Sequence, residues 1–193
     1  MNEKKIYLLL TDTGTLFTRT IKMFTKKPYN HASFAFDSKL LETYSFGRKN
    51  PYNPFIGGFV KENVRSGLFK HAKGAIFSCT VTEEQMMHLK LFIQKIESQQ
   101  HCYKYNFLGL FAVLFNKPII RENAFFCSEF VATALYEASI LRLSKPLSLI
   151  TPDDLQQDEQ FDLIYEGPLT NLFKGVEALK DTTSAFAMES IGI

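Results

Sequence analysis

The sequence of 193 residues has no tryptophan and only three cysteines, Cys79, Cys102 and Cys127. An odd number of widely spaced cysteines is not the pattern of a disulfide framework. The sequence has no CxxC motif and no paired His/Cys spacing of the kind that indicates a zinc site. We therefore expect no metal, no other cofactor and a reducing compartment.

Long apolar runs and an excess of one charge are also missing. No segment approaches the roughly 18 apolar residues that suggest a membrane-spanning helix. The apolar run at residues 6–10 is too short for the hydrophobic region of a signal peptide. The net charge of +2 is too small to indicate a nucleic-acid partner. These absences favour a cytoplasmic protein without a transmembrane segment, and they leave its oligomeric state open.

The composition is that of an ordinary globular protein, with 46% hydrophobic and 22% charged residues. The length suits one domain with a full core. We find no internal repeat and no linker that would divide the chain. We expect residues 1–168 to form one domain, and residues 169–193 to form a C-terminal helix followed by a loosely ordered tail.

Hydrophobic periodicity separates the expected strands from the expected helices. A capping box at Thr82 marks the start of one helix. The segment 47–58, which carries Arg48, Tyr52 and Phe55, is expected to be a long loop that either faces a substrate or folds over the sheet. The expected strands are residues 6–10, 31–36, 40–46, 59–62, 74–81 and 161–165, and the expected helices are residues 16–24, 83–98 and 105–115, with two more beginning at residues 127 and 152.

The segment 125–132 places Cys127 where a helix is expected to begin. Unpaired N–H groups and the positive end of the helix dipole favour a thiolate there, and the thiolate is the nucleophilic form of cysteine. The same N–H groups could hold an oxyanion. The alternative interpretation is that Cys127 is a small core residue packed beneath Phe125 and Phe126.

His31 is the candidate base for such a nucleophile. It opens a strand with plain alternation, and its neighbours on the same face, Ser33 and Ala35, are small. Small neighbours leave room for another element, such as a helix N-terminus, to approach the imidazole.

A catalytic base also needs a third group to orient it, and Glu42 on the next strand is the predicted one. A three-residue turn centred on Ser38 would put Ser45 opposite His31 and Glu42 on the other face. A two-residue turn would keep Glu42 on the His31 face, but about 13 Å away along the strand. A wider loop or a bulge could bring it closer. The alternatives for the third group are Tyr44, Ser45 and Glu62.

Two short motifs carry a resemblance to a known family. Residues 30–35 (NHASFA) begin a strand, and residues 126–131 (FCSEFV) later begin a helix. This order, histidine before cysteine, resembles the circularly permuted branch of the NlpC-type papain-like cysteine peptidases, which includes the lecithin:retinol acyltransferase-like proteins. The similarity spans roughly residues 6–165. It includes residues 151–155, which are similar to a Pro-Asp-Leu element, and residues 44–48, which resemble a signature of an uncharacterised bacterial subgroup.

The resemblance implies an α+β fold, an antiparallel sheet packed against helices in a permuted papain-like arrangement. It also implies a Cys–His hydrolase in which Cys127 attacks an acyl carbon and His31 moves the proton. The expected function is therefore that of a cysteine amidase or peptidase acting on a peptide or a small acyl-containing substrate. The alternatives are a lipid acyl hydrolase or acyltransferase of the same fold, and a binding module without turnover.

Overall fold

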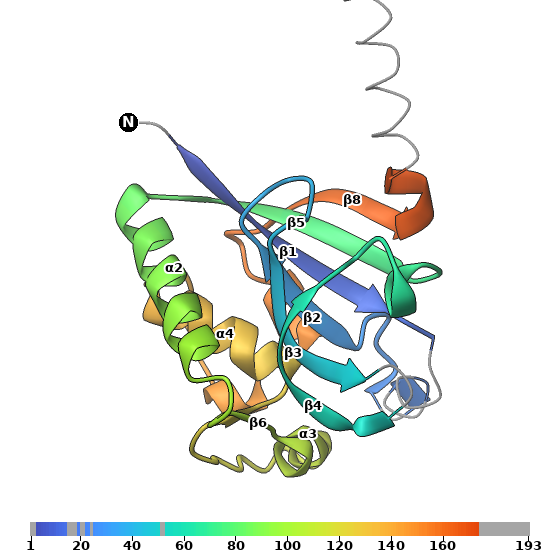
Figure 1. Ribbon diagram of the computed structural model, residues 1–193, viewed down its shortest axis with the longest axis vertical. Coiled ribbons are helices and arrows are strands. Elements are labelled where there is room, and N and C mark those ends of the chain that lie inside the picture. The colour runs from blue at the N-terminus through green and yellow to red at the C-terminus, as the bar shows by residue number, and fades with distance from the viewer. Residues whose placement is uncertain (1–2, 15–18, 20–21, 24, 51–52, 174–193) are drawn as a thin grey trace, which may run out of the picture.

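The computed structural model describes residues 3–14, 19, 22–23, 25–50 and 53–173, and its centre is a six-stranded antiparallel sheet with the strand order β4-β3-β2-β1-β5-β8 (Figure 1). Helices pack against this sheet, which confirms the predicted α+β class. The strands of the sheet are β1 (Lys4–Asp12), β2 (His31–Ala35), β3 (Thr43–Asn50), β4 (Asn53–Glu62), β5 (Lys73–Val81) and β8 (Asp162–Pro168).

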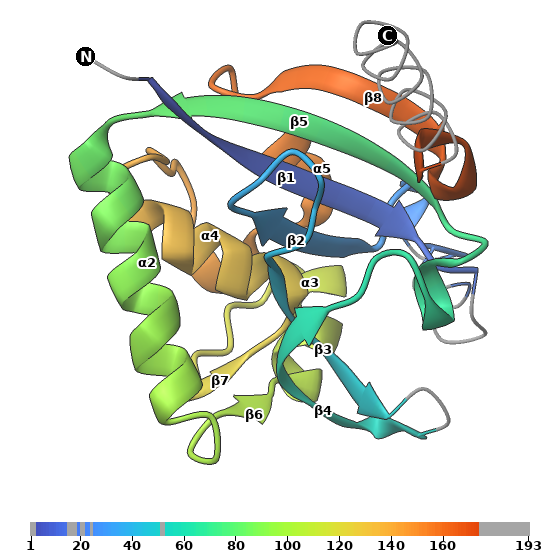
Figure 2. The same ribbon diagram turned by 45° about the horizontal axis from the view of Figure 1, so that its top comes forward.

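Two longer helices form the layer beside the sheet, as Figures 1 and 2 show. Helix α4 (Cys127–Glu137) packs against β2 and β3, and α2 (Glu83–Ser98) packs against α4. The predicted capping box at the start of α2 is present, with Thr82 and Gln85 bonded reciprocally. The shorter elements are η1 (Gly67–Phe69), the parallel pair β6 (Lys104–Tyr105) and β7 (Ala124–Phe125), α3 (Phe107–Leu114), η2 (Leu147–Leu149) and α5 (Pro152–Gln156).

Strand β1 is buried on both faces, as its continuous apolar run predicts. Ile6, Leu8 and Leu10 belong to the large core cluster on the helical side. Leu9 belongs to a smaller cluster on the opposite side, where Phe69 of η1 packs. Strand β1 therefore contributes side chains to two apolar clusters, one on each face of the sheet.

The prediction of a loop at residues 47–58 is wrong for most of that segment. Its residues extend β3 and β4, which pair as a hairpin. Its glycines permit close packing rather than a turn. A Cβ added to Gly57 would lie 3.0 Å from the Tyr105 side chain, and one added to Gly58 would lie 2.9 Å from Lys49 Cε. Tyr52 lies outside the described residues.

The predicted helix at 16–24 falls mainly on residues that are not described. At the other end, residues 169–173 are helical, as the start of the predicted C-terminal helix requires, and residues 174–193 lie outside the description. Leu169 is fully buried in the smaller apolar cluster. Within the described part of the chain, no helix has both the length and the apolar character needed to cross a membrane.

The ring of Phe130 is the centre of the contact between α4 and the sheet. It is fully buried and lies 5.0 Å from the Phe46 ring and 5.9 Å from the Phe34 ring, measured between centroids. We expect Phe130→Ala to lower the free energy of unfolding by about 3–5 kcal/mol, because it leaves a cavity among aromatic rings. Urea denaturation measures this loss. Phe115→Ala, at a ring that is 73% exposed, is the matched control and should change stability by about 0.5 kcal/mol or less.

Candidate active site

Cys127 is the first residue of α4. The preceding residue, Phe126, has an extended backbone (φ −101°, ψ 172°) and is the N-cap. The N–H groups in the first turn of a helix have no acceptor within the helix, so they are available to a group bound beside Cys127. The cysteine is only 3% exposed, yet it lines a cavity that opens beside it.

Three hydrogen bonds hold the start of α4 in place, and two of them connect it to other segments of the chain. Ser128 Oγ donates to the carbonyl oxygen of Ile150 at 2.7 Å. The Glu129 carboxylate accepts a bond from the Phe126 N–H at 3.3 Å and a second, also at 3.3 Å, from Asn106 Nδ2. Burial raises the pKa of Glu129 to about 7, although both hydrogen bonds act to lower it. These contacts fix the position of Cys127 relative to β6 and the segment before α5.

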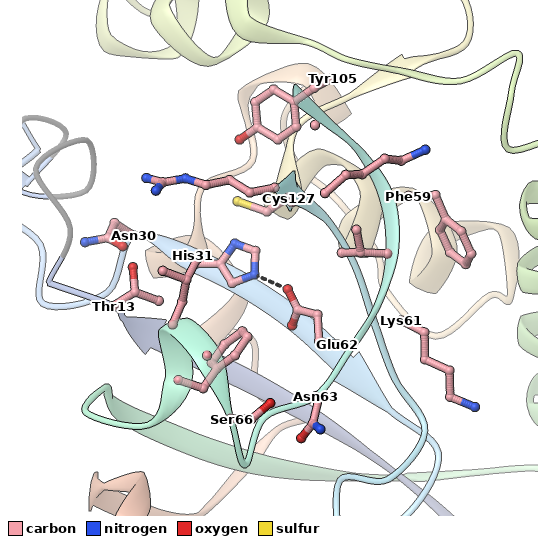
Figure 3. Close-up of a pocket in the computed structure, with 18 of the residues that line it drawn as sticks. Thr13, Asn30, His31, Phe59, Lys61, Glu62, Asn63, Ser66, Tyr105 and Cys127 are labelled. Atoms are coloured by element: carbon pink, nitrogen blue, oxygen red, sulfur yellow. Dashed lines mark hydrogen bonds and ion pairs between the residues drawn. The ribbon is translucent and has the colours of Figure 1, made fainter. Parts of the chain in front are cut away.

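The structure brings His31 and Cys127 together. The imidazole is a hydrogen-bond partner of the Cys127 side chain, and its Nε2 lies 2.7 Å from Oε1 of Glu62. Figure 3 shows the ring between the sulfur and the carboxylate, with its two nitrogens facing different partners. The three residues come from β2, α4 and β4, and their contacts follow the order that a nucleophile, its base and an acid that orients the base require.

Glu62 is held by more than the histidine. Ser33 Oγ donates to Oε2 at 2.6 Å, and Ser45 Oγ donates to Oε1 at 2.8 Å. Ser45 Oγ also lies 3.3 Å from His31 Nε2. The Glu62 side chain is 6% exposed, so these contacts replace water around a buried carboxylate. The carboxylate is therefore fixed in the orientation that faces the imidazole.

The predicted third residue, Glu42, is not at this site and is corrected to Glu62. The Glu42 side chain is 52% exposed and faces Lys61 Nζ at 3.7 Å. Its carbonyl accepts a bond from the Phe36 N–H, which places it five positions from His31 along the strand, on the opposite face. Five positions in a strand are about 17 Å.

The width of the β2–β3 turn explains this correction. Asp37 accepts bonds from the backbone N–H groups of Lys39, Leu41 and Glu42, and Leu40 has a positive φ of 57°. The turn is therefore wider than the two- and three-residue turns considered from the sequence, and the extra residues move Glu42 further from His31 rather than closer. Of the alternatives named above, Ser45 and Glu62 reach the imidazole.

Gly47 marks the place where His31 and Glu62 reach across β3 to each other. A Cβ at this position would lie 3.3 Å from Ser45 Oγ, 3.4 Å from Glu62 Oε1 and 3.5 Å from His31 Cε1. Small residues on one face of β2 and β3, at positions 33, 45 and 47, are thus the sequence signal for a long acidic side chain arriving from the next strand. The prediction of a loop at residues 47–58 left β4 too short to suggest this arrangement.

The charges around His31 favour its protonated form. Burial alone would lower the pKa of His31, but the negative charge of Glu62 and the hydrogen bond to Cys127 raise it to about 10. The imidazole therefore keeps its proton at neutral pH beside the Glu62 carboxylate.

The cavity beside Cys127 has a volume of about 610 Å³, which is within the range of small-molecule sites. His31 and Cys127 form part of its wall, together with Tyr105, whose pKa is raised well above its ordinary value by burial and by the charge of Cys127. Figure 3 shows Tyr105 on the far side of Cys127 from His31. The other lining residues include apolar side chains at Phe59, Leu68, Phe69, Phe107 and Leu110, and cationic ones at Arg48, Lys49 and Lys61.

The other two cysteines have different surroundings. Cys79 lies on β5 in the large core cluster, as predicted, and burial raises its pKa to about 11. Cys102 is exposed. Cys127 is thus the one cysteine of the three that faces an imidazole and a cavity.

Comparison with known proteins adds no relative: no family model matches the chain, and neither does any curated protein or solved structure. The resemblance to permuted papain-like peptidases stays a prediction.

The titration of His31 tests its link to Glu62. We expect the chemical shift of the His31 Cε1 proton to report a pKa of about 10 for the imidazole. Glu62→Gln should lower this pKa, because it removes the negative charge that stabilises the protonated ring. The folded-state value lies above the roughly 6.5 of an unperturbed histidine. Protonated His31 therefore stabilises the fold below about pH 6.5, and this contribution is lost as the pH rises through about 10.

Proton NMR of the wild type and of Glu62→Gln measures these values, with His31→Ala to assign the resonance. Glu42→Gln is the matched control, since its carboxylate faces Lys61, and it should leave the titration unchanged. A His31 resonance that titrates near pH 6.5 in the wild type would contradict the arrangement described here.

The space at Gly47 gives a second test. In Gly47→Val the added methyl groups would stand between His31 and Glu62, so we expect the His31 pKa to fall as it does in Glu62→Gln. Gly47→Ala adds one carbon at 3.3–3.5 Å from its neighbours and should cause a smaller shift. The same NMR titration separates the two variants. A His31 pKa equal to that of the wild type in both variants would show that the absence of a side chain at position 47 is not needed for the contact between His31 and Glu62.

Proposed function

We propose that the protein is a cysteine hydrolase of the amidase or peptidase type, with Cys127 as nucleophile, His31 as acid–base and Glu62 as the residue that orients His31. The observation that carries this is the double contact of one buried imidazole, with the Cys127 side chain as one partner and the Glu62 carboxylate as the other. A cysteine that served only to fill the core would need neither the imidazole beside it nor the carboxylate that contacts that imidazole.

In the proposed reaction the thiolate of Cys127 attacks the carbonyl carbon of the substrate. A C–S bond forms, and the electron pair of the C=O bond moves to the oxygen, where N–H groups in the first turn of α4 would hold the negative charge. His31 then gives its proton to the leaving amine as the C–N bond breaks, which leaves an acyl-enzyme.

The second half of the reaction uses the same residues in reverse. Neutral His31 takes a proton from a water molecule, and the resulting hydroxide attacks the acyl carbon. The C–S bond breaks, the carboxylic acid leaves, and the thiolate faces an imidazolium again. Glu62 takes no part in these proton transfers, and its bonds to Ser33 and Ser45 keep the imidazole in one orientation.

A lipid acyl hydrolase or acyltransferase is the second candidate. It is favoured by the phenylalanine and leucine side chains of the cavity, including Phe59 and Phe69 near the catalytic residues. An acyl chain would bury its apolar surface against them.

We also propose a cytoplasmic location, which is supported by the free state of all three cysteines.

Labelling with a thiol-directed acyl probe at pH 7 tests the proposed nucleophile. We expect selective modification of Cys127, slowed about 10²–10⁴-fold in His31→Ala because the acid–base group is lost. Glu62→Gln should also slow it, whereas Glu42→Gln, the matched exposed carboxylate, should not. Exposed Cys102 gives the unassisted rate within the same molecule. Equal labelling of all three cysteines would favour a binding module without turnover.

Product release separates the two enzyme candidates. Amine release from peptide amides is compared with fatty-acid release from phospholipid esters, each with the wild type and Cys127→Ser. We expect turnover of the amides that disappears in Cys127→Ser. Turnover of the lipid alone would overturn the amidase assignment and leave the lipid hydrolase.

A further inference from the structure

Helix α3 and the residues after it carry large apolar side chains on the outside of the molecule. Phe107 and Leu110 of this helix line the cavity of Cys127. Its other side, at positions i, i+3 and i+7, faces solvent. The exposed set, called here the α3 patch, is Leu108, Phe111, Phe115, Ile119 and Ile120, with exposed fractions between 37% and 83%.

The density of these side chains distinguishes the patch from ordinary surface. Single exposed apolar residues are normal, but a contiguous group marks a site for a protein or a membrane. Here five such side chains fall within residues 108–120. Lys117 N–H bonds to the Ala112 carbonyl, so the chain turns back at the end of α3 and keeps residues 115–117 close to the helix.

The charges around the patch indicate which partner it fits. Lys104 precedes it, and Lys117 and Arg121 lie within and after it, all three exposed. None of them has an ion-pair partner among the described residues. The only acid in residues 104–122 is Glu122. Apolar side chains edged by unpaired cations match a membrane with anionic head groups, which accepts both kinds of side chain at once.

We propose that the α3 patch docks on the surface of a membrane that contains anionic lipids. Helix α3 has eight residues, about 12 Å, so it would lie in the interface and not cross the bilayer, whose apolar core is about 30 Å. Because the inner side of α3 lines the cavity, docking brings the entrance near Cys127 close to the lipid. In Figure 1 α3 lies at the lower end of the molecule and β8 at the upper end.

Vesicle co-sedimentation of the Cys127→Ser protein tests this, since turnover cannot alter the lipid and the result does not depend on the proposed hydrolysis. The vesicles contain equal parts of phosphatidylcholine and phosphatidylglycerol, or phosphatidylcholine alone. We expect binding to the anionic vesicles that weakens at least about tenfold when Phe111→Ser and Phe115→Ser are combined. Lys117→Gln with Arg121→Gln should weaken it about tenfold and make it less sensitive to salt.

The matched control combines Met87→Ser and Leu91→Ser on α2, where both side chains are about half exposed and i, i+4 apart. This variant should bind like the parent, and circular dichroism checks that every variant is folded. Equal binding to both kinds of vesicle, or no loss in the double phenylalanine variant, would overturn the proposal. A concentration-dependent dimer that is lost in that variant would do the same, because a second copy of the chain would then cover the patch.

Discussion

The structure of the site depends on one interaction, the bond between His31 Nε2 and Glu62 Oε1 at 2.7 Å in a setting that excludes most water. Burial on its own would favour a neutral imidazole. The carboxylate and the hydrogen bond to Cys127 reverse that preference, and Ser33 and Ser45 donate hydrogen bonds to the carboxylate in place of water. The same contact with Glu62 thus determines both the position and the charge of the imidazole, and both depend on a fixed Glu62 side chain.

This interaction constrains the register of three strands. His31 begins β2 and Glu62 ends β4, so their side chains meet only if β3 between them is narrow at that point. Gly47 supplies the narrow point. Slipping β3 by one residue would turn Ser45 away from the site, because alternate residues face opposite sides of a sheet. The Asp37 turn therefore contributes to the geometry of the site through the strand pairing that it imposes, although it lies at the other end of the hairpin.

Local patterns in the sequence are enough to predict those parts of the site that depend on one element. Alternation identifies the face of β2 that carries His31, and the change from an apolar segment to helical spacing places Cys127 at the start of α4. Glu62 could not be chosen over Glu42 in this way, because that choice depends on two pairings and on the turn. A carboxylate bonded to three backbone N–H groups widened the turn, and glycines that serve close packing were interpreted as loop residues.

The chain contains its own comparison for the interpretation of Cys127. Cys79 and Cys127 are buried to almost the same degree, at 2% and 3% exposure. Cys79 has apolar neighbours that penalise a thiolate, and its pKa rises to about 11. Cys127 has an imidazole as its partner and a cavity beside it. Burial alone therefore does not determine the surroundings of a thiol in this fold. What differs is an imidazole within hydrogen-bond reach of Cys127, which the Glu62 carboxylate contacts on its other side and which Ser33 and Ser45 support through that carboxylate.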